Sequence, residues 1–112
     1  MKIYHNSRCS KSRAGLAYLE SLNTDFEIIK YIDKGLTVDE LTLVVQKTGL
    51  IPFELVRTQE KIYKKNYKGK KFSDTEWIVI LAENPTLLQR PIVINRDKAV
   101  LAQPPEEINK IF

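Results

Sequence analysis

Cysteine and histidine are almost absent from this sequence, since each occurs once in 112 residues. A single cysteine excludes an internal disulfide framework, so any disulfide must form with a partner molecule. One cysteine and one histidine, with no carboxylate near them in the sequence, cannot make a structural zinc site. We therefore expect no metal and no bound cofactor.

Long apolar runs and targeting features are also missing. No stretch approaches the ~20 consecutive apolar residues of a membrane span, and the chain starts directly with a strand-like pattern. No internal repeat or low-complexity linker is visible, and hydrophobic residues make up 43%, enough for one core. These features predict a cytoplasmic protein with one domain over residues 1–112 and no membrane attachment.

Basic residues exceed acidic residues by 18 to 14, which gives a net charge of +4. Much of this excess lies in residues 61–71, which read KIYKKNYKGKK. Lysines interleaved with Tyr63 and Tyr67 are one pattern of a surface that binds nucleic acid or another polyanion. The pattern is also typical of a solvated helix face and loop. We prefer this second interpretation and expect no direct contact with DNA.

The hydrophobic pattern predicts strands at both ends of the chain and helices in the middle. Leucines at three-residue spacing after residue 10 indicate a helix, and β-branched and aromatic residues from 26 onward indicate a strand. Thr37 and Ser73 each begin a capping box, with a glutamate three residues later. The predicted strands cover residues 2–5, 26–31, 92–94 and 99–101; the predicted helices cover 10–21, 37–49, 53–57, 58–66, 73–84 and the residues from 104 onward.

This order of elements predicts an α/β fold. A strand, a helix and a strand within about thirty residues suggest a βαβ unit with parallel strands. The whole order is that of the thioredoxin-like fold, a four-stranded mixed sheet with helices on both faces, and here with a helical insertion in the middle. In that fold the proline before the third strand, here Pro91, is cis and faces the catalytic cysteine. We predict this geometry, although a trans proline at a strand start is commoner in general.

Cys9 lies at the predicted turn between the first strand and the first helix. Backbone N–H groups in the first turn of a helix have no intrahelical partners, so a thiol there ionises more easily than a free one. Four nearby residues can add positive charge, namely His5, Arg8, Lys11 and Arg13. A solitary cysteine is more often a small buried hydrophobe, but this one has an arginine and a serine as neighbours. We therefore predict a reactive thiolate.

Three pieces of the chain form a recognisable combination: HNxxCxxSR at residues 5–13, the region of Arg57, and RPIV at residues 90–93. Together they resemble the glutaredoxin-dependent arsenate reductases, a thioredoxin-fold family, and the related Spx-like regulators. The resemblance implies that the Cys9 thiolate attacks the arsenic of arsenate. Glutathione then attacks the adduct, and glutaredoxin resolves the mixed disulfide. An external thiol agrees with the lack of a second cysteine.

The resemblance also assigns roles within the site. The residue that matches His5 helps to keep the thiolate ionised. Those that match Arg57 and Arg90 bind the oxyanion, for which a planar guanidinium is well suited, and Arg13 is a further candidate. The alternatives are a surface arginine for Arg57 and a strand-edge residue for Arg90.

Asn6 and Ser12 complete the predicted catalytic set, with helix capping or turn formation as their alternative role. The chain departs from the resemblance at one position. The arsenate reductases carry a third arginine before a proline near the C-terminus, and a gap-free count places Gln103 there. We expect Gln103 to face the site beside Cys9 and to bind an oxyanion less well than an arginine. Arg96 could take the role instead, although it lies in a predicted turn.

These observations predict a thiol-dependent reductase of the arsenate reductase type. Its substrate is arsenate or a glutathione mixed disulfide, and glutathione and glutaredoxin are its reducing partners. The alternative is an Spx-like regulator that binds RNA polymerase. Such regulators commonly use a CxxC switch, which cannot form here because Ser12 stands at the second position.

Overall fold

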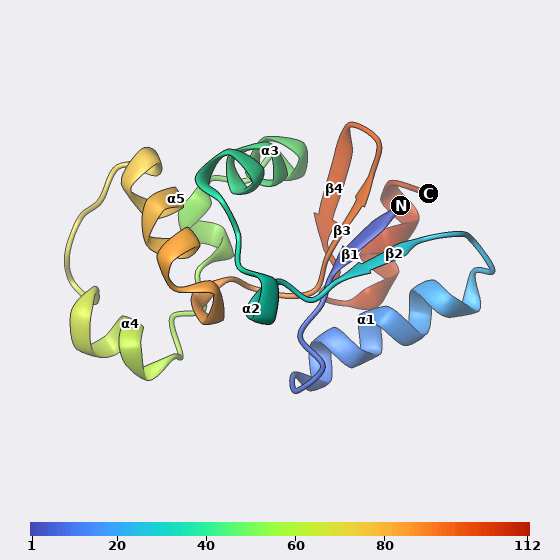
Figure 1. Ribbon diagram of the computed structural model, residues 1–112, viewed down its shortest axis with the longest axis horizontal. Helices are drawn as coiled ribbons and strands as arrows, with labels where there is room; N and C mark the ends of the chain where they lie inside the picture. The colour runs from blue at the N-terminus through green and yellow to red at the C-terminus, as the bar shows by residue number, and fades with distance from the viewer.

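Figure 1 shows the computed structural model, which describes residues 1–112. Its centre is a four-stranded sheet with the strand order β2-β1-β3-β4. The central strand β1 pairs parallel with β2 and antiparallel with β3, which pairs antiparallel with β4. This mixed sheet confirms the predicted thioredoxin-like arrangement. The strands are β1 (Lys2–Tyr4), β2 (Glu27–Ile29), β3 (Ile92–Asn95) and β4 (Lys98–Leu101).

The sheet separates two hydrophobic clusters because successive side chains of a strand point to opposite faces. Ile3 belongs to the smaller cluster, which α1 (Ser10–Ser21) and the C-terminal 3-10 helix η3 (Pro105–Lys110) cover. Its neighbour Tyr4 belongs to the larger cluster, to which α3 (Val38–Thr48) contributes. Helices therefore cover both faces of the sheet, as predicted.

The helical insertion extends away from the sheet and makes the molecule elongated (Figure 1), with extents of 42 × 26 × 24 Å. Trp77 gathers the aromatic rings of this region, with centroid distances of 5.0 Å to Phe72, 6.3 Å to Tyr63 and 6.1 Å to Tyr67. Both tyrosines of the lysine-rich stretch thus pack inward. No helix has the length and apolar character that crossing a membrane requires. The insertion contains α2 (Tyr31–Lys34), α3, η1 (Pro52–Leu55), α4 (Lys61–Asn66), α5 (Asp74–Glu83) and η2 (Pro85–Leu87).

Several predicted boundaries are wrong by a few residues. The second strand ends at Ile29, and Tyr31 begins α2 instead, where it is fully buried. Helix α4 begins at Lys61 and not at residue 58. The predicted helix over 53–57 is a 3-10 turn that stops at Leu55, because the next residue forms a β-bridge with the segment before β3.

The two predicted capping boxes behave differently. At Ser73 both reciprocal hydrogen bonds form, as predicted. At Thr37 only half of the box forms: its hydroxyl accepts from the Glu40 N–H. The Glu40 carboxylate instead accepts from the Tyr4 hydroxyl and pairs with Lys34. At Thr37 the missing half of the box is therefore replaced by a hydrogen bond of Glu40 that links α3 to the sheet.

The Arg90–Pro91 peptide bond is cis, which confirms the prediction, and the Gln103–Pro104 bond is also cis. Pro91 packs against α1 at Gly15, where a Cβ atom would collide with the proline ring. The absence of a side chain at Gly15 thus lets the helix that starts at Cys9 lie directly on the segment that carries Arg90. This close approach sets the position of the candidate site.

Candidate functional site

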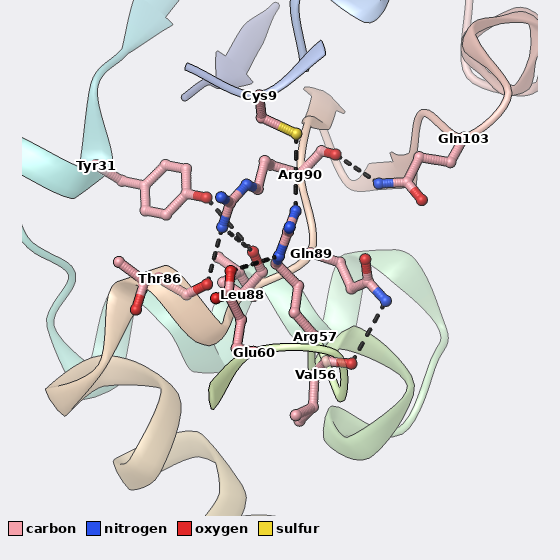
Figure 2. Close-up of polar contacts among 10 residues, drawn as sticks. All are labelled: Cys9, Tyr31, Val56, Arg57, Glu60, Thr86, Leu88, Gln89, Arg90 and Gln103. Atoms are coloured by element: carbon pink, nitrogen blue, oxygen red, sulfur yellow. Dashed lines mark hydrogen bonds and ion pairs between the residues drawn. The ribbon is translucent and has the colours of Figure 1, made fainter. Parts of the chain in front are cut away.

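The candidate site lies where β1 ends and α1 begins, and Figure 2 shows its side chains. Cys9 is the N-cap residue of α1 and is partly exposed. The two predicted arginines approach it from separate parts of the chain: Arg57 follows η1, and Arg90 directly precedes β3. The structure thus brings together three residues that lie 33 or more positions apart in the sequence.

A network of short-range hydrogen bonds holds the loop before Cys9. The buried Ser12 hydroxyl lies 2.7 Å from His5 Nδ1 and accepts from the Asn6 N–H. The Asn6 side-chain Oδ1 accepts from the N–H of Arg8, and the Asn6 main-chain carbonyl accepts from the Cys9 N–H. Asn6 and Ser12 therefore shape the turn, which is the alternative role considered for them.

His5 does not supply the positive charge expected of it. Burial lowers its pKa below the ordinary value; a hydrogen bond to Ser12 opposes this, and the charges of Lys30 and Arg13 lower it further. The imidazole is thus neutral near pH 7. The Ser12 hydroxyl accepts from the Asn6 N–H and keeps one proton and one lone pair, so it can serve either neutral tautomer of His5 at Nδ1.

The Cys9 thiol is activated by donors on both sides. Burial alone raises its pKa, but the Ser12 N–H, the guanidinium groups of Arg90 and Arg57, and the Lys11 N–H together lower it to about 7. The two N–H groups belong to the first turn of α1, where they have no intrahelical partner. Helix and arginines therefore both stabilise the thiolate, and about half of the thiol is ionised at neutral pH.

Arg57 is fixed by its main chain and by a carboxylate. Its N–H donates to the Leu87 carbonyl, and the Gln89 N–H donates to the Leu55 carbonyl, so the two segments run side by side. The guanidinium Nε lies 3.1 Å from Glu60 Oε1, and Nη1 lies 3.7 Å from Cys9 Sγ. One edge of the guanidinium is thus anchored while another faces the thiol.

Arg90 is held even more tightly, and one of its donors is free. The residue is 6% exposed, and Nη1 donates to the carbonyls of Thr86 (2.9 Å) and Leu88 (3.2 Å). Its Nε is the one buried side-chain nitrogen or oxygen in the chain without a hydrogen-bond partner. An unsatisfied buried donor is costly. This nitrogen is closed to solvent, and the Arg90 guanidinium lowers the pKa of Cys9 through a side-chain hydrogen bond, so the acceptor that the guanidinium faces is the thiolate sulfur.

Arg13, Gln103 and Arg96 make no contact with the Cys9 thiol. Arg13 is exposed and donates from Nη1 to the Ser7 carbonyl at 3.0 Å, so it braces the loop. Gln103 donates from Nε2 to the main-chain carbonyl of Arg90 at 2.6 Å (Figure 2), a contact that the sequence did not suggest. Arg96 lies in the β3–β4 turn beyond the Lys2 end of β1, at the opposite end of the sheet from Cys9. It therefore cannot replace a third arginine.

Three residues of the site were missed from the sequence. Glu60 anchors Arg57 across a turn that precedes α4, and the i,i+3 spacing is a signal for an ion pair only on a helix. Thr86 acts only through its carbonyl, for which a sequence gives no signal. Tyr31 donates weakly to the Leu88 carbonyl at 3.5 Å. Burial raises its pKa to about 12 despite the nearby Arg90, so it stays protonated.

No group of three or more histidine, cysteine, aspartate or glutamate side chains comes together in a way that could hold a metal ion.

Comparisons with known proteins agree with this geometry. The model of the ArsC family matches residues 4–111. A protein named arsenate reductase from Haemophilus influenzae is 39% identical over 98% of this chain and 97% of its own length. One of the same name from Neisseria meningitidis is 35% identical over 100% of this chain and 97% of its own. The solved structure of an arsenate reductase from Vibrio cholerae superposes with a TM-score of 0.92 at 37% identity, over 100% of this chain and 98% of that one.

Proposed function

The chain belongs to the ArsC family, and on this premise we propose that it is an arsenate reductase that uses Cys9 as its nucleophile and external thiols as its reductant. The observation that carries the proposal is the pair of anchored guanidinium groups, Arg57 and Arg90, beside an ionisable thiol. A tetrahedral oxyanion offers acceptors in several directions, so its oxygens can accept from donors of both guanidinium groups.

The chemistry begins with the Cys9 thiolate. Its sulfur attacks the arsenic atom, an S–As bond forms, and one arsenate oxygen leaves as water after taking protons from the solvent. The arginines stabilise the negative charge on the remaining oxygens, and the N–H groups at the start of α1 are aimed at the same place.

The electrons for reduction come from two thiols. An external thiol attacks the Cys9 sulfur, a mixed disulfide forms, and the electron pair of the broken S–As bond reduces arsenic from the +5 to the +3 state. Because the chain has one cysteine, a second external thiol must release Cys9. We assign glutathione to the first step and glutaredoxin to the second, in a reducing compartment such as the cytoplasm.

A coupled assay tests the proposal. NADPH consumption is followed with glutathione, glutathione reductase and glutaredoxin, with arsenate added or omitted. We expect arsenate-dependent consumption with the native protein and none with Cys9→Ser, because a hydroxyl is a far weaker nucleophile at neutral pH. Consumption that does not depend on arsenate would contradict the proposed substrate. Steady turnover with thioredoxin and no small thiol would contradict glutathione as reductant.

The regulator alternative gains no specific observation. Ser12, at the second position of the CxxC switch, is fully buried and is bonded to His5 and Asn6. Contact with RNA polymerase therefore stays a prediction without structural support.

A further inference from the structure

A polar cleft lies beside the loop that precedes Cys9. Its volume is about 340 Å³, and only one of its lining residues is hydrophobic. Arg8 and Lys30 bring positive charge to its walls and Asp33 brings negative charge, and none of the three forms a salt bridge within the chain. All three side chains are exposed. The cleft thus presents both signs of charge to a ligand.

We propose that this cleft binds the charged ends of a zwitterionic thiol peptide of the glutathione class. Asp33 pairs with the ammonium group of the ligand, and Arg8 and Lys30 pair with its carboxylates. A purely anionic ligand would leave Asp33 unfavourably placed, and a cation would meet the same difficulty at the two basic residues. Use of this site during arsenate reduction rests on the proposed function, whereas binding itself does not.

The position of the cleft suits delivery of a thiol to Cys9. Arg8 precedes Cys9 directly, and the loop residues that line the cleft are those held by Ser12. Thr86 lines the cleft as well, and its carbonyl holds Arg90. The cleft therefore borders both the loop that carries Cys9 and the segment whose carbonyl holds Arg90, so a ligand in the cleft lies next to the thiol site.

The other hollows of the surface fit such a ligand less well. A cleft of about 400 Å³ lies on the Gln103 side of α1, but its surface is mainly apolar and its one charged residue is Lys11. Another, of about 390 Å³, includes Arg96 and therefore lies at the opposite end of the sheet from Cys9. A hollow of about 520 Å³ shares Lys30 and Asp33 with the cleft and adds Glu27 and Lys34, but it runs along β2 and includes no residue of the loop before Cys9. The cleft beside Arg8 combines both signs of charge with that loop.

Thiol–disulfide exchange measures this recognition without arsenate. The Cys9 thiolate attacks one sulfur of glutathione disulfide; the disulfide bond of the reagent breaks, a new one forms to Cys9, and one glutathione thiolate leaves, with no net oxidation. Hydroxyethyl disulfide reacts by the same step but carries no charge. The ratio of the two second-order rate constants, followed by intact mass at one pH, therefore reports charge recognition and is insensitive to the ionised fraction of Cys9.

We expect Asp33→Asn and Lys30→Gln each to lower this ratio by roughly two- to fivefold, which corresponds to ~0.4–1 kcal/mol and lies in the upper part of the range for exposed ion pairs. The double variant should lower it further. Asp97→Asn in the β3–β4 turn and Lys98→Gln at the start of β4 make the same chemical changes far from the cleft, and should leave the ratio within twofold of the native value. All four positions are exposed, so folding should survive.

Two results would overturn the inference: a ratio that Asp33→Asn and Lys30→Gln leave unchanged, or equal losses in the control variants. Failure of the proposed function looks different. If the protein does not reduce arsenate, yet Asp33→Asn lowers its selectivity for glutathione disulfide, the inference about the cleft stands and arsenate is rejected as the substrate. If arsenate is reduced normally and the ratio is unchanged in Asp33→Asn and Lys30→Gln, the proposed function stands and the inference about the cleft is rejected.

Discussion

Positive charge is concentrated in two regions of this molecule, and they are built differently. At the Cys9 site, two arginines are held at defined positions by a carboxylate and by main-chain carbonyls. In residues 61–71, six exposed lysines carry no acidic partner. Outside this stretch the chain has 12 basic and 14 acidic residues. The net positive charge of the protein therefore comes from the lysines and says little about the site.

The difference shows what makes charge chemically useful. An anchored guanidinium has lost its freedom before a ligand arrives, and its unpaired donors point at a fixed place. An exposed lysine is solvated and flexible, and salt screens its field within about 10 Å at 0.1 M ionic strength. We therefore expect arginine substitutions at the site to alter chemistry strongly, and lysine substitutions in residues 61–71 to alter it little.

The largest expected effect is that of Arg90→Met, which keeps much of the side-chain volume and removes every donor. Hydrogen bonds to a charged group contribute ~1.5–3 kcal/mol, so KM for arsenate should rise roughly 10- to 100-fold. The Leu88 carbonyl also loses a donor, and unfolding by urea should show a loss of about 1–3 kcal/mol. A loss of stability with unchanged arsenate kinetics would mean that Arg90 has a structural role only.

Ionisation of Cys9 gives the next comparison. Alkylation by iodoacetamide, followed against pH, should inflect near 7 in the native protein. In Arg57→Met the inflection should move to higher pH, because the thiolate loses one donor at 3.7 Å. His5 should not contribute an inflection above its ordinary value, since burial lowers its pKa. An unchanged curve in Arg57→Met would show that the Arg57 guanidinium does not stabilise the thiolate.

The same thiol links stability to pH. Its folded-state pKa, about 7, lies below the value of 9.0 for an unperturbed thiol, so the unfolded chain binds more protons between these values. Stability relative to Cys9→Ser should therefore rise as pH increases from 7 to 9 and be lost as pH falls through 7. Urea unfolding of both proteins across this window checks the sign.

Substitutions of Gln103 should change the KM for arsenate less, and the change depends on whether the side chain faces the oxyanion. Its Nε2 donates to the Arg90 carbonyl and so steadies the main chain behind the guanidinium. Gln103→Leu removes that donor, and a neutral hydrogen bond contributes ~1 kcal/mol, so KM for arsenate should rise about fivefold. Gln103→Arg retains a donor and adds charge, and should lower KM below the native value. If Gln103→Arg changes nothing, then residue 103 supports Arg90 without facing the oxyanion.

The sequence predicted the parts of this site that local chemistry determines. The strand-to-helix turn, Cys9 at its N-cap position and the proline before β3 all follow from short-range patterns. The pairing of residues 55–57 with 87–89 did not follow, because it depends on two main-chain hydrogen bonds across 30 residues. The free Nε of Arg90 could not be predicted either, since it is a property of the packed interior and not of any motif.

The failures have equally local causes. Tyr31 has a strong preference for strands, yet it begins α2, because its ring is buried between the helical insertion and the sheet and packs 6.4 Å from the ring of Tyr4. His5 was expected to be a cation, but a buried imidazole beside two basic residues is more stable when neutral. Tertiary packing thus decided against the intrinsic preference of Tyr31, whereas for His5 it reinforced a preference for the neutral form that an imidazole already has at pH 7.

The smallest expected effect completes the comparison. Lys64→Gln/Lys65→Gln removes two charges from α4 without touching its aromatic contacts, since Tyr63 and Tyr67 pack on Trp77 from the other side. At 0.15 M salt we expect the KM for arsenate and the Cys9 inflection to stay within twofold and within error of the native values, respectively. The matched measurement is Arg57→Met, which removes one charge but an anchored one. If the lysine variant weakens arsenate binding as much as Arg57→Met does, then the diffuse field of α4 contributes to the site, and anchoring is not what separates the two regions. If the loss of arsenate affinity disappears at high salt in the lysine variant but persists in Arg57→Met, the lysines attract the anion at long range and the arginine binds it directly.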